Sequence, residues 1–357
     1  MRAGMWAVIS AMILLATMPG AGPAAGAGLD VSVEGNLPSG NYRAASVTTG
    51  KEVLLFGGRN ETNLSSSVLS YDPAMRRISL APFSLPQPRM SACAAFDGKE
   101  AFVFGGSDGG LELASILAVD PDSGTVRTLA ASLPSPRIGL VAAIWGGDLF
   151  IFGGHSNGTM ISGILQFHPG TEELTAMAAS LPTGRAGMGI ISTGTGIYLF
   201  GGKTANASSD EVLLYRPDMD ELAVLPARLP YPVYHAPAVW MGEKAFILGG
   251  NAVLPGWNIS KATDTIVEFD PSTGGSSVSK ARLPSPRERT SAAIDGGKIF
   301  VFGGQEGVRA LDEIVAISYS DSSGDSGRGI PLGATAPYIL LGIVAVLLLA
   351  LAFARRR

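Results

Sequence analysis

Six short apolar runs along the chain each end in a pair of glycines, and mostly polar residues separate them. The runs are VLLFGG, AFVFGG, LFIFGG, IYLFGG, AFILGG and IFVFGG, and their first glycines are Gly57, Gly105, Gly153, Gly201, Gly249 and Gly303. The interval between them is 48 residues four times and 54 residues once. A period near 50 that holds over six copies indicates one supersecondary unit repeated around an axis.

Each unit contains four strand signals that turn residues separate. A run of small and apolar residues comes first, as in Ser91–Phe96, and a glycine-containing turn leads into the run that ends in Gly-Gly. The third signal ends in an aromatic or branched residue, often before an Asp-Pro turn such as Asp72-Pro73. The fourth is more polar and leads into segments such as Leu85–Arg89. The pattern predicts four-stranded antiparallel sheets whose small first strands crowd around the axis.

These elements resemble kelch-repeat β-propellers of the galactose oxidase type over residues 29–320. The matching features are the glycine pair, the aromatic residue before the Asp-Pro turn and the Pro-Arg that starts the next unit. Kelch units usually place a tryptophan seven residues after that aromatic residue, and this chain departs from the pattern with Ile78, Val126, Leu174 and Leu222. The resemblance implies an all-β, six-bladed propeller.

The two ends of the repeat region predict how the ring closes. Leu29–Asn36 and the following Leu37-Pro38 align with a fourth strand, whereas the last unit supplies three strands and stops near Ile317–Tyr319. We therefore expect a propeller over residues 28–319 in which the N-terminal strand completes the last blade. Such closure leaves no open sheet edge in the ring.

The flanking segments predict export and a membrane anchor. Residues 1–27 have the charge, apolar stretch and small-residue site of a secretory signal, and residues 320–336 form a Ser/Gly-rich stalk. Residues 337–354 carry no charge and are long enough for a transmembrane helix, and the three arginines at 355–357 would stay cytoplasmic. A cleaved sorting signal is the alternative for this tail, but no recognisable tripeptide precedes Tyr338. The prediction is a single-pass cell-membrane protein with an extracellular propeller.

Charge and cysteine content narrow the classes of partner. Arg2 lies in the signal segment and the last three arginines in the cytoplasmic tail, so the predicted extracellular part has 22 of the 26 Lys and Arg residues against 30 Asp and Glu residues. Without a basic cluster, this acidic balance argues against a nucleic-acid partner. Cys93 is the only cysteine, so no intrachain disulfide can form.

Candidate binding residues gather in the loops of one face. In an antiparallel unit, the connections from fourth to first strand and from second to third strand emerge on the same side. Four of the connections from fourth to first strand have an arginine at the same position, and Asn41 and Val233 occupy this position in the other two units. The arginines are Arg89, Arg137, Arg185 and Arg287. They would form a partial positive ring for an acidic ligand, or each would bind carbonyl groups of the adjacent blade. Trp257 in the longer fifth unit and His235 complete the ligand-binding candidates.

Five of the eight asparagines begin an Asn-x-Ser/Thr sequence, and all five follow a glycine pair. This frequency exceeds the roughly one expected by chance and predicts an N-glycosylated extracellular surface. The alternative is that polar residues are common in loops. The candidate sites are Asn60, Asn63, Asn157, Asn206 and Asn258.

The sequence offers no set of catalytic or metal-binding residues. The three histidines, His155, His168 and His235, belong to different units and lack metal-ligand spacing, so we expect no metal and no cofactor. The leading hypothesis is a non-catalytic cell-surface module that binds an extracellular protein or glycan through the loop face. The alternative is a carbohydrate-active enzyme similar to kelch-like sialic acid epimerases or mutarotases, with His235 or His155 as the proton carrier.

Overall fold

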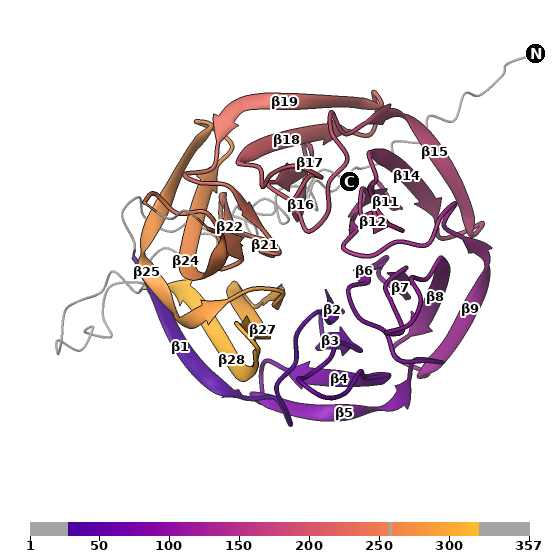
Figure 1. Cartoon of the computed structure of the whole chain (residues 1–357). Helices are drawn as coiled ribbons and strands as arrows, with labels where there is room; N and C mark the ends of the chain where they lie inside the picture. The colour runs from indigo at the N-terminus through magenta and orange to yellow at the C-terminus, as the bar shows by residue number, and fades with distance from the viewer. Residues whose placement is uncertain (1–27, 257–258, 321–357) are drawn as a thin grey trace, which may run out of the picture. The chain divides into compact units, whose positions relative to one another are not determined.

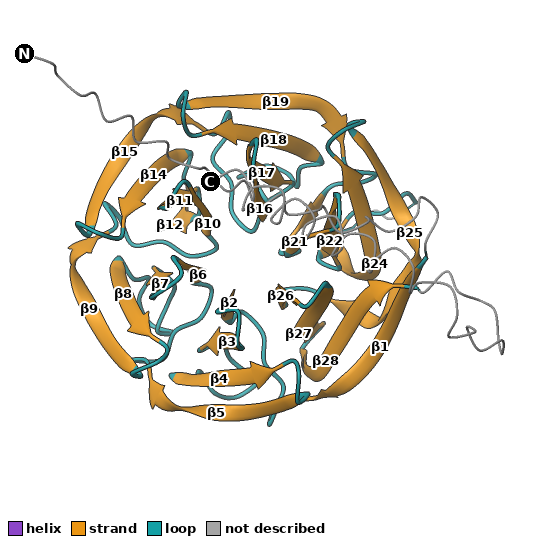
Figure 2. Cartoon of the chain, turned by 180° about the vertical axis from the view of Figure 1, so that it is seen from behind, coloured by secondary structure: helices purple, strands orange, loops and turns teal. Residues whose placement is uncertain are grey.

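The six repeats fold into six antiparallel sheets that stand around a central axis (Figures 1 and 2). The computed structural model of the chain describes residues 28–256 and 259–320. Within those residues all regular structure is β-strand, and no helix with the length and apolarity to cross a bilayer is found there. The predicted signal segment, the transmembrane segment, the arginine tail and the stalk after Ser320 lie outside the described residues.

The first three blades follow the chain in order. Blade 1 contains β2 (Ala45–Thr48), β3 (Val53–Phe56), β4 (Ser67–Asp72) and β5 (Arg77–Ser84). Blade 2 contains β6 (Cys93–Phe96), β7 (Ala101–Phe104), β8 (Ser115–Asp120) and β9 (Thr125–Ser132). Blade 3 contains β10 (Val141–Trp145), β11 (Asp148–Phe152), β14 (Gly163–His168) and β15 (Glu173–Ser180), and the hairpin β12 (His155–Ser156) and β13 (Thr159–Met160) projects from it.

The last three blades complete the ring. Blade 4 contains β16 (Gly189–Thr193), β17 (Gly196–Phe200), β18 (Glu211–Arg216) and β19 (Glu221–Arg228). Blade 5 contains β21 (Ala238–Met241), β22 (Lys244–Leu248), β24 (Lys261–Asp270) and β25 (Gly275–Arg287), extended by β20 (Val233–Tyr234) and β23 (Asn251–Ala252). Blade 6 contains β26 (Ser291–Asp295), β27 (Lys298–Glu306), β28 (Arg309–Tyr319) and β1 (Leu29–Asn36).

The predicted closure is confirmed. The N-terminal strand β1 pairs antiparallel with β28, from Leu29 opposite Tyr319 to Asn36 opposite Glu313. Because β1 is the outermost strand of a sheet otherwise made by the last repeat, the two ends of the propeller are joined within one blade (Figure 1). Backbone pairing therefore closes the ring and no covalent bond is needed.

Apolar side chains fill the seams between blades. Aromatic residues at the end of the third strand pack against the preceding blade: the Tyr71 ring lies 5.3 and 5.4 Å from the rings of Phe300 and Phe302. The residues at the tryptophan positions of kelch repeats also pack into these clusters; they are Ile78, Val126, Leu174 and Leu222. Aliphatic residues thus do the packing that a tryptophan would otherwise do at this place.

The glycine pairs hold the two kinds of loop together on one face. Gly57 has a φ of 63°, and a Cβ there would lie 2.1 Å from the carbonyl oxygen of Arg89. The chain entering the next blade therefore passes directly over the glycine, and only glycine leaves room for it. A hydrogen bond from the N–H of Gly58 to the same Arg89 oxygen, 2.8 Å long, fixes the contact. The connections from second to third and from fourth to first strand share a face, as predicted.

Candidate binding site

The central channel opens on this loop face into a cavity of about 510 Å³. Its wall consists of the innermost strands of the blades and the residues that precede them, and many of these residues are alanine or serine. Small side chains keep the axis open, because bulkier ones would meet there. The volume lies within the range of about 300–1,000 Å³ typical of small-ligand sites.

A closed ring of backbone hydrogen bonds surrounds the cavity. It joins six equivalent residues, one ahead of each blade, and each N–H donates to the carbonyl of the preceding member at 2.7 to 3.0 Å. All six have φ between 54° and 65°. The members of this axial ring are Arg43, Ser91, Gly139, Gly187, His235 and Arg289.

The left-handed conformation is unusual for four of these residues, which are not glycine. Arg43, Ser91, His235 and Arg289 adopt it although a Cβ makes it unfavourable. Such positions cost free energy and tend to gather at functional sites. Here the ring requires the conformation, and side chains are nevertheless present at four of its positions.

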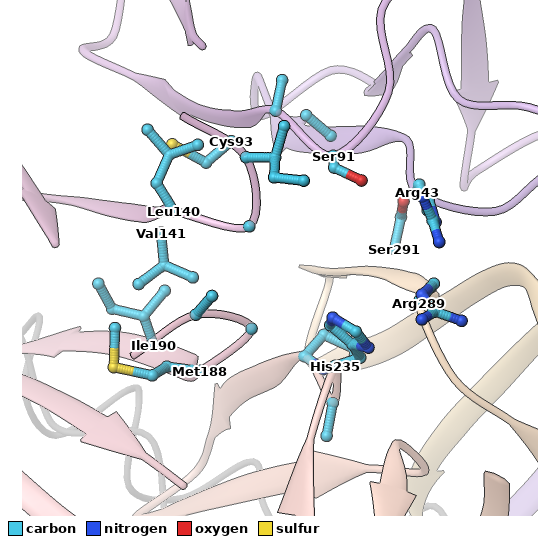
Figure 3. Close-up of a pocket in the computed structure, with 18 of the residues that line it drawn as sticks. Arg43, Ser91, Cys93, Leu140, Val141, Met188, Ile190, His235, Arg289 and Ser291 are labelled. Atoms are coloured by element: carbon cyan, nitrogen blue, oxygen red, sulfur yellow. The ribbon is translucent and has the colours of Figure 1, made fainter. Parts of the chain in front are cut away.

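Two ring arginines give one side of the cavity positive charge, and a ring histidine lies on the same side. We call Arg43, His235 and Arg289 the cationic arc; Figure 3 shows them on the same side of the cavity. Arg289 Nη1 lies 2.9 Å from Glu288 Oε1, and His235 Nδ1 lies 3.3 Å from Glu288 Oε2. The Arg43 guanidinium has no carboxylate partner within the described residues, and its Nη1 donates to Met90 Sδ at 3.8 Å. One carboxylate therefore faces two arginines.

The titration of these groups leaves a net positive charge at neutral pH. Burial is the main cause that lowers the pKa of His235, and its hydrogen bond to Glu288 opposes the shift, so the imidazole is neutral. Burial and then the Arg289 charge lower the pKa of Arg43 below its usual 12.5, which still leaves it protonated. Burial alone would raise the pKa of Glu288, but contacts with His235 and Arg289 keep it lowered.

The opposite side of the cavity is apolar. Figure 3 shows five side chains there, which we call the apolar wall: Cys93, Leu140, Val141, Met188 and Ile190. They come from the start of blades 2, 3 and 4. Burial raises the pKa of the Cys93 thiol, so it belongs to this wall as an apolar group and not as a reactive thiolate.

Two further cations lie near the cationic arc: Lys203 lines the cavity, and Arg59 lies over the ring of Tyr42, the neighbour of Arg43 in the sequence. Lys203 Nζ stands 5.3 Å from the centre of the Tyr234 ring, and the Arg59 guanidinium 5.8 Å from that of Tyr42. Neither forms an ion pair within the part of the chain that the structure describes. The approach to the cavity is therefore also positively charged.

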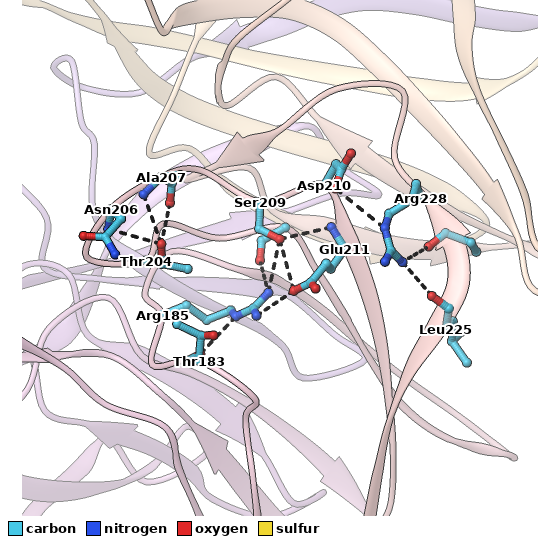
Figure 4. Close-up of polar contacts among 12 residues, drawn as sticks. Thr183, Arg185, Thr204, Asn206, Ala207, Ser209, Asp210, Glu211, Leu225 and Arg228 are labelled. Atoms are coloured by element: carbon cyan, nitrogen blue, oxygen red, sulfur yellow. Dashed lines mark hydrogen bonds and ion pairs between the residues drawn. The ribbon is translucent and has the colours of Figure 1, made fainter.

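The four repeated arginines lie elsewhere. Their side chains are buried, with 0 to 4 % exposed, and each donates to the carbonyl of the first glycine 16 residues further on; they are Arg89, Arg137, Arg185 and Arg287. The backbone of each is bound to one blade and the guanidinium to the next; Figure 4 shows the Arg185 guanidinium bound to Ser209 and Glu211. The expected positive ring of these side chains at the channel mouth is not formed, because the unpaired glycine carbonyls in the seams bind them instead.

The two exceptions to the arginine pattern support this scaffold role. Asn41 Nδ2 donates to the carbonyl of Gly57 at 3.0 Å, again 16 residues further on. Val233 cannot donate, and in that seam the buried hydroxyl of Tyr231 bonds the hydroxyl of Thr265 in blade 5. Where the arginine is missing, Asn41 or Tyr231 therefore supplies a hydrogen bond between neighbouring blades.

The remaining candidates occupy different places. Asn63, Asn157 and Asn206 are exposed on loops of the cavity face, and the amide oxygen of Asn60 accepts hydrogen bonds within its own turn. Glycosylation of these sites stays a prediction. Trp257 and Asn258 lie outside the described residues.

The other two histidines do not join the site chemically. His155 pairs with Glu112 at 3.2 Å at the edge of the cavity, whereas His168 pairs with Asp148 at 2.9 Å within blade 3. Across residues 28–256 and 259–320, no group of three or more His, Cys, Asp or Glu side chains is arranged to hold a metal ion.

Six blades in a closed ring, with a ligand-sized cavity at one mouth of the axis, define a β-propeller. A profile of the KLHDC2/KLHL20/DRC7 kelch-repeats domain matches residues 43–250, more than half of the chain. The chain therefore belongs to the kelch-repeat family, which confirms the resemblance seen in the sequence.

Comparison of structures agrees on the fold. The solved structure of YjhT superimposes with a TM-score of 0.67 over 80 % of this chain and 97 % of that one, at 17 % sequence identity. Identity this low extends the likeness to the fold alone. The search among curated proteins gave no match.

The residues of the cationic arc were in part visible in the sequence. His235 was a candidate, but Arg43 and Arg289 were not, although each lies two residues after the repeated Arg or Asn position. The feature of the sequence that distinguishes these ligand-binding candidates is that the residue at their position varies from one unit to the next. The four arginines repeat because each blade needs the same tie, whereas the position two residues later changes from unit to unit.

Proposed function

We propose that this propeller is a non-catalytic binding module, displayed outside the cell, that captures an anionic group of a protein or glycan at its channel mouth. The observation that carries the proposal is the charge balance of the cationic arc. Arg43 and Arg289 face a cavity of ligand size with Glu288 as their shared counter-ion, so one positive charge is left for a ligand.

The position of the charge favours binding over a purely structural role. Arg289 and Glu288 are held by the ring and the seam, whereas Arg43 is half-buried and lacks an ionic partner in the described residues. Charge-assisted hydrogen bonds to arginine are the strong ones, and a partly desolvated guanidinium gains most from an incoming carboxylate. The nearby cations Lys203 and Arg59 would draw an acidic ligand toward the mouth.

The proposal includes the predicted membrane topology. A signal segment at residues 1–27 and a span at 337–354 would place the propeller outside the cell on a Ser/Gly-rich stalk. Protease added to intact cells that produce the chain should then remove the propeller, while permeabilised cells would be needed if it faced the cytoplasm.

The binding test uses the full chain on an array of acidic and neutral glycans and peptides. Arg43→Gln together with Arg289→Gln should reduce capture of acidic members at least tenfold, because both strong donors are lost. The matched control is Arg77→Gln with Lys99→Gln, which removes two exposed charges away from the cavity. Equal loss in both double variants, or none in the first, would refute the proposal.

A second candidate rests on His235 and Glu288. A neutral imidazole that a buried carboxylate orients, on the wall of a cationic cavity, has the arrangement of a general base. A carbohydrate-active enzyme for sialic acids would use it. Exchange between the anomers of sialic acid, followed by NMR with the full chain, tests this candidate, and a rate equal to that in buffer rejects it.

A further inference from the structure

The cavity has two unlike walls, and this determines the kind of anion it suits. The cationic arc forms one side, and the apolar wall forms the other (Figure 3). Thr290, which follows Arg289 in the sequence, also lines the cavity. A ligand that only carried charge would leave the half-buried side chains of Val141 and Ile190 uncovered, and a purely apolar ligand would leave the Arg43 guanidinium without a carboxylate partner.

Two buried polar atoms on the cationic side have no hydrogen-bond partner among the described residues. They are Nε of Arg43 and Oγ1 of Thr290, whose side chains both line the cavity. Thr290 is only 9 % exposed. Buried polar groups in native proteins almost always have a partner, so each of these side chains, both of which line the cavity, retains an unused hydrogen-bond donor.

We infer that the cavity binds a small amphipathic monocarboxylate, with its head between Arg43 and Arg289 and its aliphatic or aromatic body against the apolar wall. This inference rests on the proposed function and names the class of ligand for the same site. The carboxylate accepts hydrogen bonds from the two guanidinium groups and from the Thr290 hydroxyl. The body removes apolar surface of the wall from water.

The same walls select against related anions. A dicarboxylate long enough to reach the apolar wall would desolvate its second charge there with no donor to compensate. An amide of the same length would bring no charge to the cationic arc. Specificity thus depends on one charged end and one apolar end.

The test compares matched ligands by calorimetry with the full chain. Acetate, butyrate and hexanoate should bind with affinities that rise about two- to fourfold per methylene, as expected for burial of each group. Adipate, which adds a second charge to the six-carbon chain, and hexanamide, which removes the charge, should each bind at least tenfold more weakly than hexanoate.

Variants assign the binding to this cavity. Val141→Thr, nearly equal in volume, should flatten the dependence on chain length and leave acetate unchanged, whereas Arg43→Gln should weaken all three carboxylates. Arg77→Gln is the charge control. Hexanoate binding that both cavity variants leave unaltered would overturn the inference.

The outcomes also separate this inference from the proposed function. Capture of acidic glycans or peptides that depends on Arg43, together with affinities that do not change with chain length, would overturn the amphipathic ligand and keep the binding module. Binding of hexanoate that follows the expected series without capture of any macromolecule would support the inference and reject the larger partner.

Discussion

Replacing Arg185 by methionine tests the assignment of the repeated arginines to the scaffold. The Arg185 backbone is tied to blade 3, since its N–H donates to Ile161 and its carbonyl accepts from Gly154. Its guanidinium crosses to blade 4, where Nη2 lies 2.7 Å from Glu211 Oε2 and Nη1 lies 3.4 Å from the carbonyl oxygen of Gly201 (Figure 4). Methionine keeps most of the buried volume and removes the contacts of the guanidinium, while the backbone hydrogen bonds to Ile161 and Gly154 remain possible.

The expected loss of stability depends on the Glu211 carboxylate, which the substitution leaves without its partner. The Arg185 side chain is 1 % exposed, and breaking a fully buried ion pair costs about 3–5 kcal/mol. Glu211 is 30 % exposed and can recover part of its hydration, so we expect about 2–3 kcal/mol of free energy of unfolding to be lost. At about 2 °C for each kcal/mol in a domain of this size, Tm should fall by about 4–6 °C.

Differential scanning calorimetry of the full chain measures this change. The double variant Arg185→Met with Glu211→Gln should lose less than the sum of the single variants, because the unpaired carboxylate is removed as well. Binding of acidic ligands should persist in the folded protein, since Arg185 does not line the cavity. A Tm within about 1 °C of the wild type, combined with loss of ligand binding, would show that these arginines form the binding site after all.

Three further predictions concern the axial ring and its neighbours. Gly187→Ala should lower the free energy of unfolding by about 1–2 kcal/mol and weaken carboxylate binding, because its Cβ would lie 2.5 Å from His235 Cδ2. Gly139→Ala has nearly the same φ but its nearest contact is at 3.3 Å, so this variant should lose stability and keep its affinity. Thermal melts and calorimetric titrations compare the two variants. Glu288→Gln should tighten carboxylate binding severalfold by freeing Arg289 while lowering Tm, and weaker binding would contradict the assigned charge balance. The pKa of His235 is lower in the folded protein than its usual 6.5, so the unfolded state binds the proton more readily. The contribution of His235 to stability should therefore be constant above about pH 6.5 and decline as the pH falls from there toward the folded-state pKa. His235→Asn should flatten the decline in Tm measured from about pH 7.5 to about pH 5.

Most of the fold was predictable because repetition makes the sequence redundant. The glycine pairs fixed the number of blades, and the missing fourth strand of the last unit predicted the role of Leu29–Asn36. What could not be predicted was the direction of a side chain at a repeated position. The constant interval of 16 residues from Arg89 to Gly105, and from each equivalent residue to its glycine, was the available sign of a tie within the scaffold.

The binding site was harder to predict because it depends on how six loops meet. Arg43 and Arg289 are separated by almost the whole propeller in sequence, yet the N–H of Arg43 donates to the carbonyl of Arg289 at 2.9 Å. Only closure of the ring makes them neighbours. In a repeat protein, positions that are identical in every unit serve the scaffold, and positions that vary among equivalent loops are better candidates for ligand contacts.

Closure by β1 also has a consequence for biosynthesis. The partner of β1 ends at Tyr319, so the first strand of the propeller to leave the ribosome must wait for the last one before it can pair. Until then β28 has not been made and the nascent chain is an open arc of blades with an exposed apolar seam at each end. The ring therefore cannot close before β28 has been made, and truncation shortly before Tyr319 should be far more harmful than its small share of the chain would indicate.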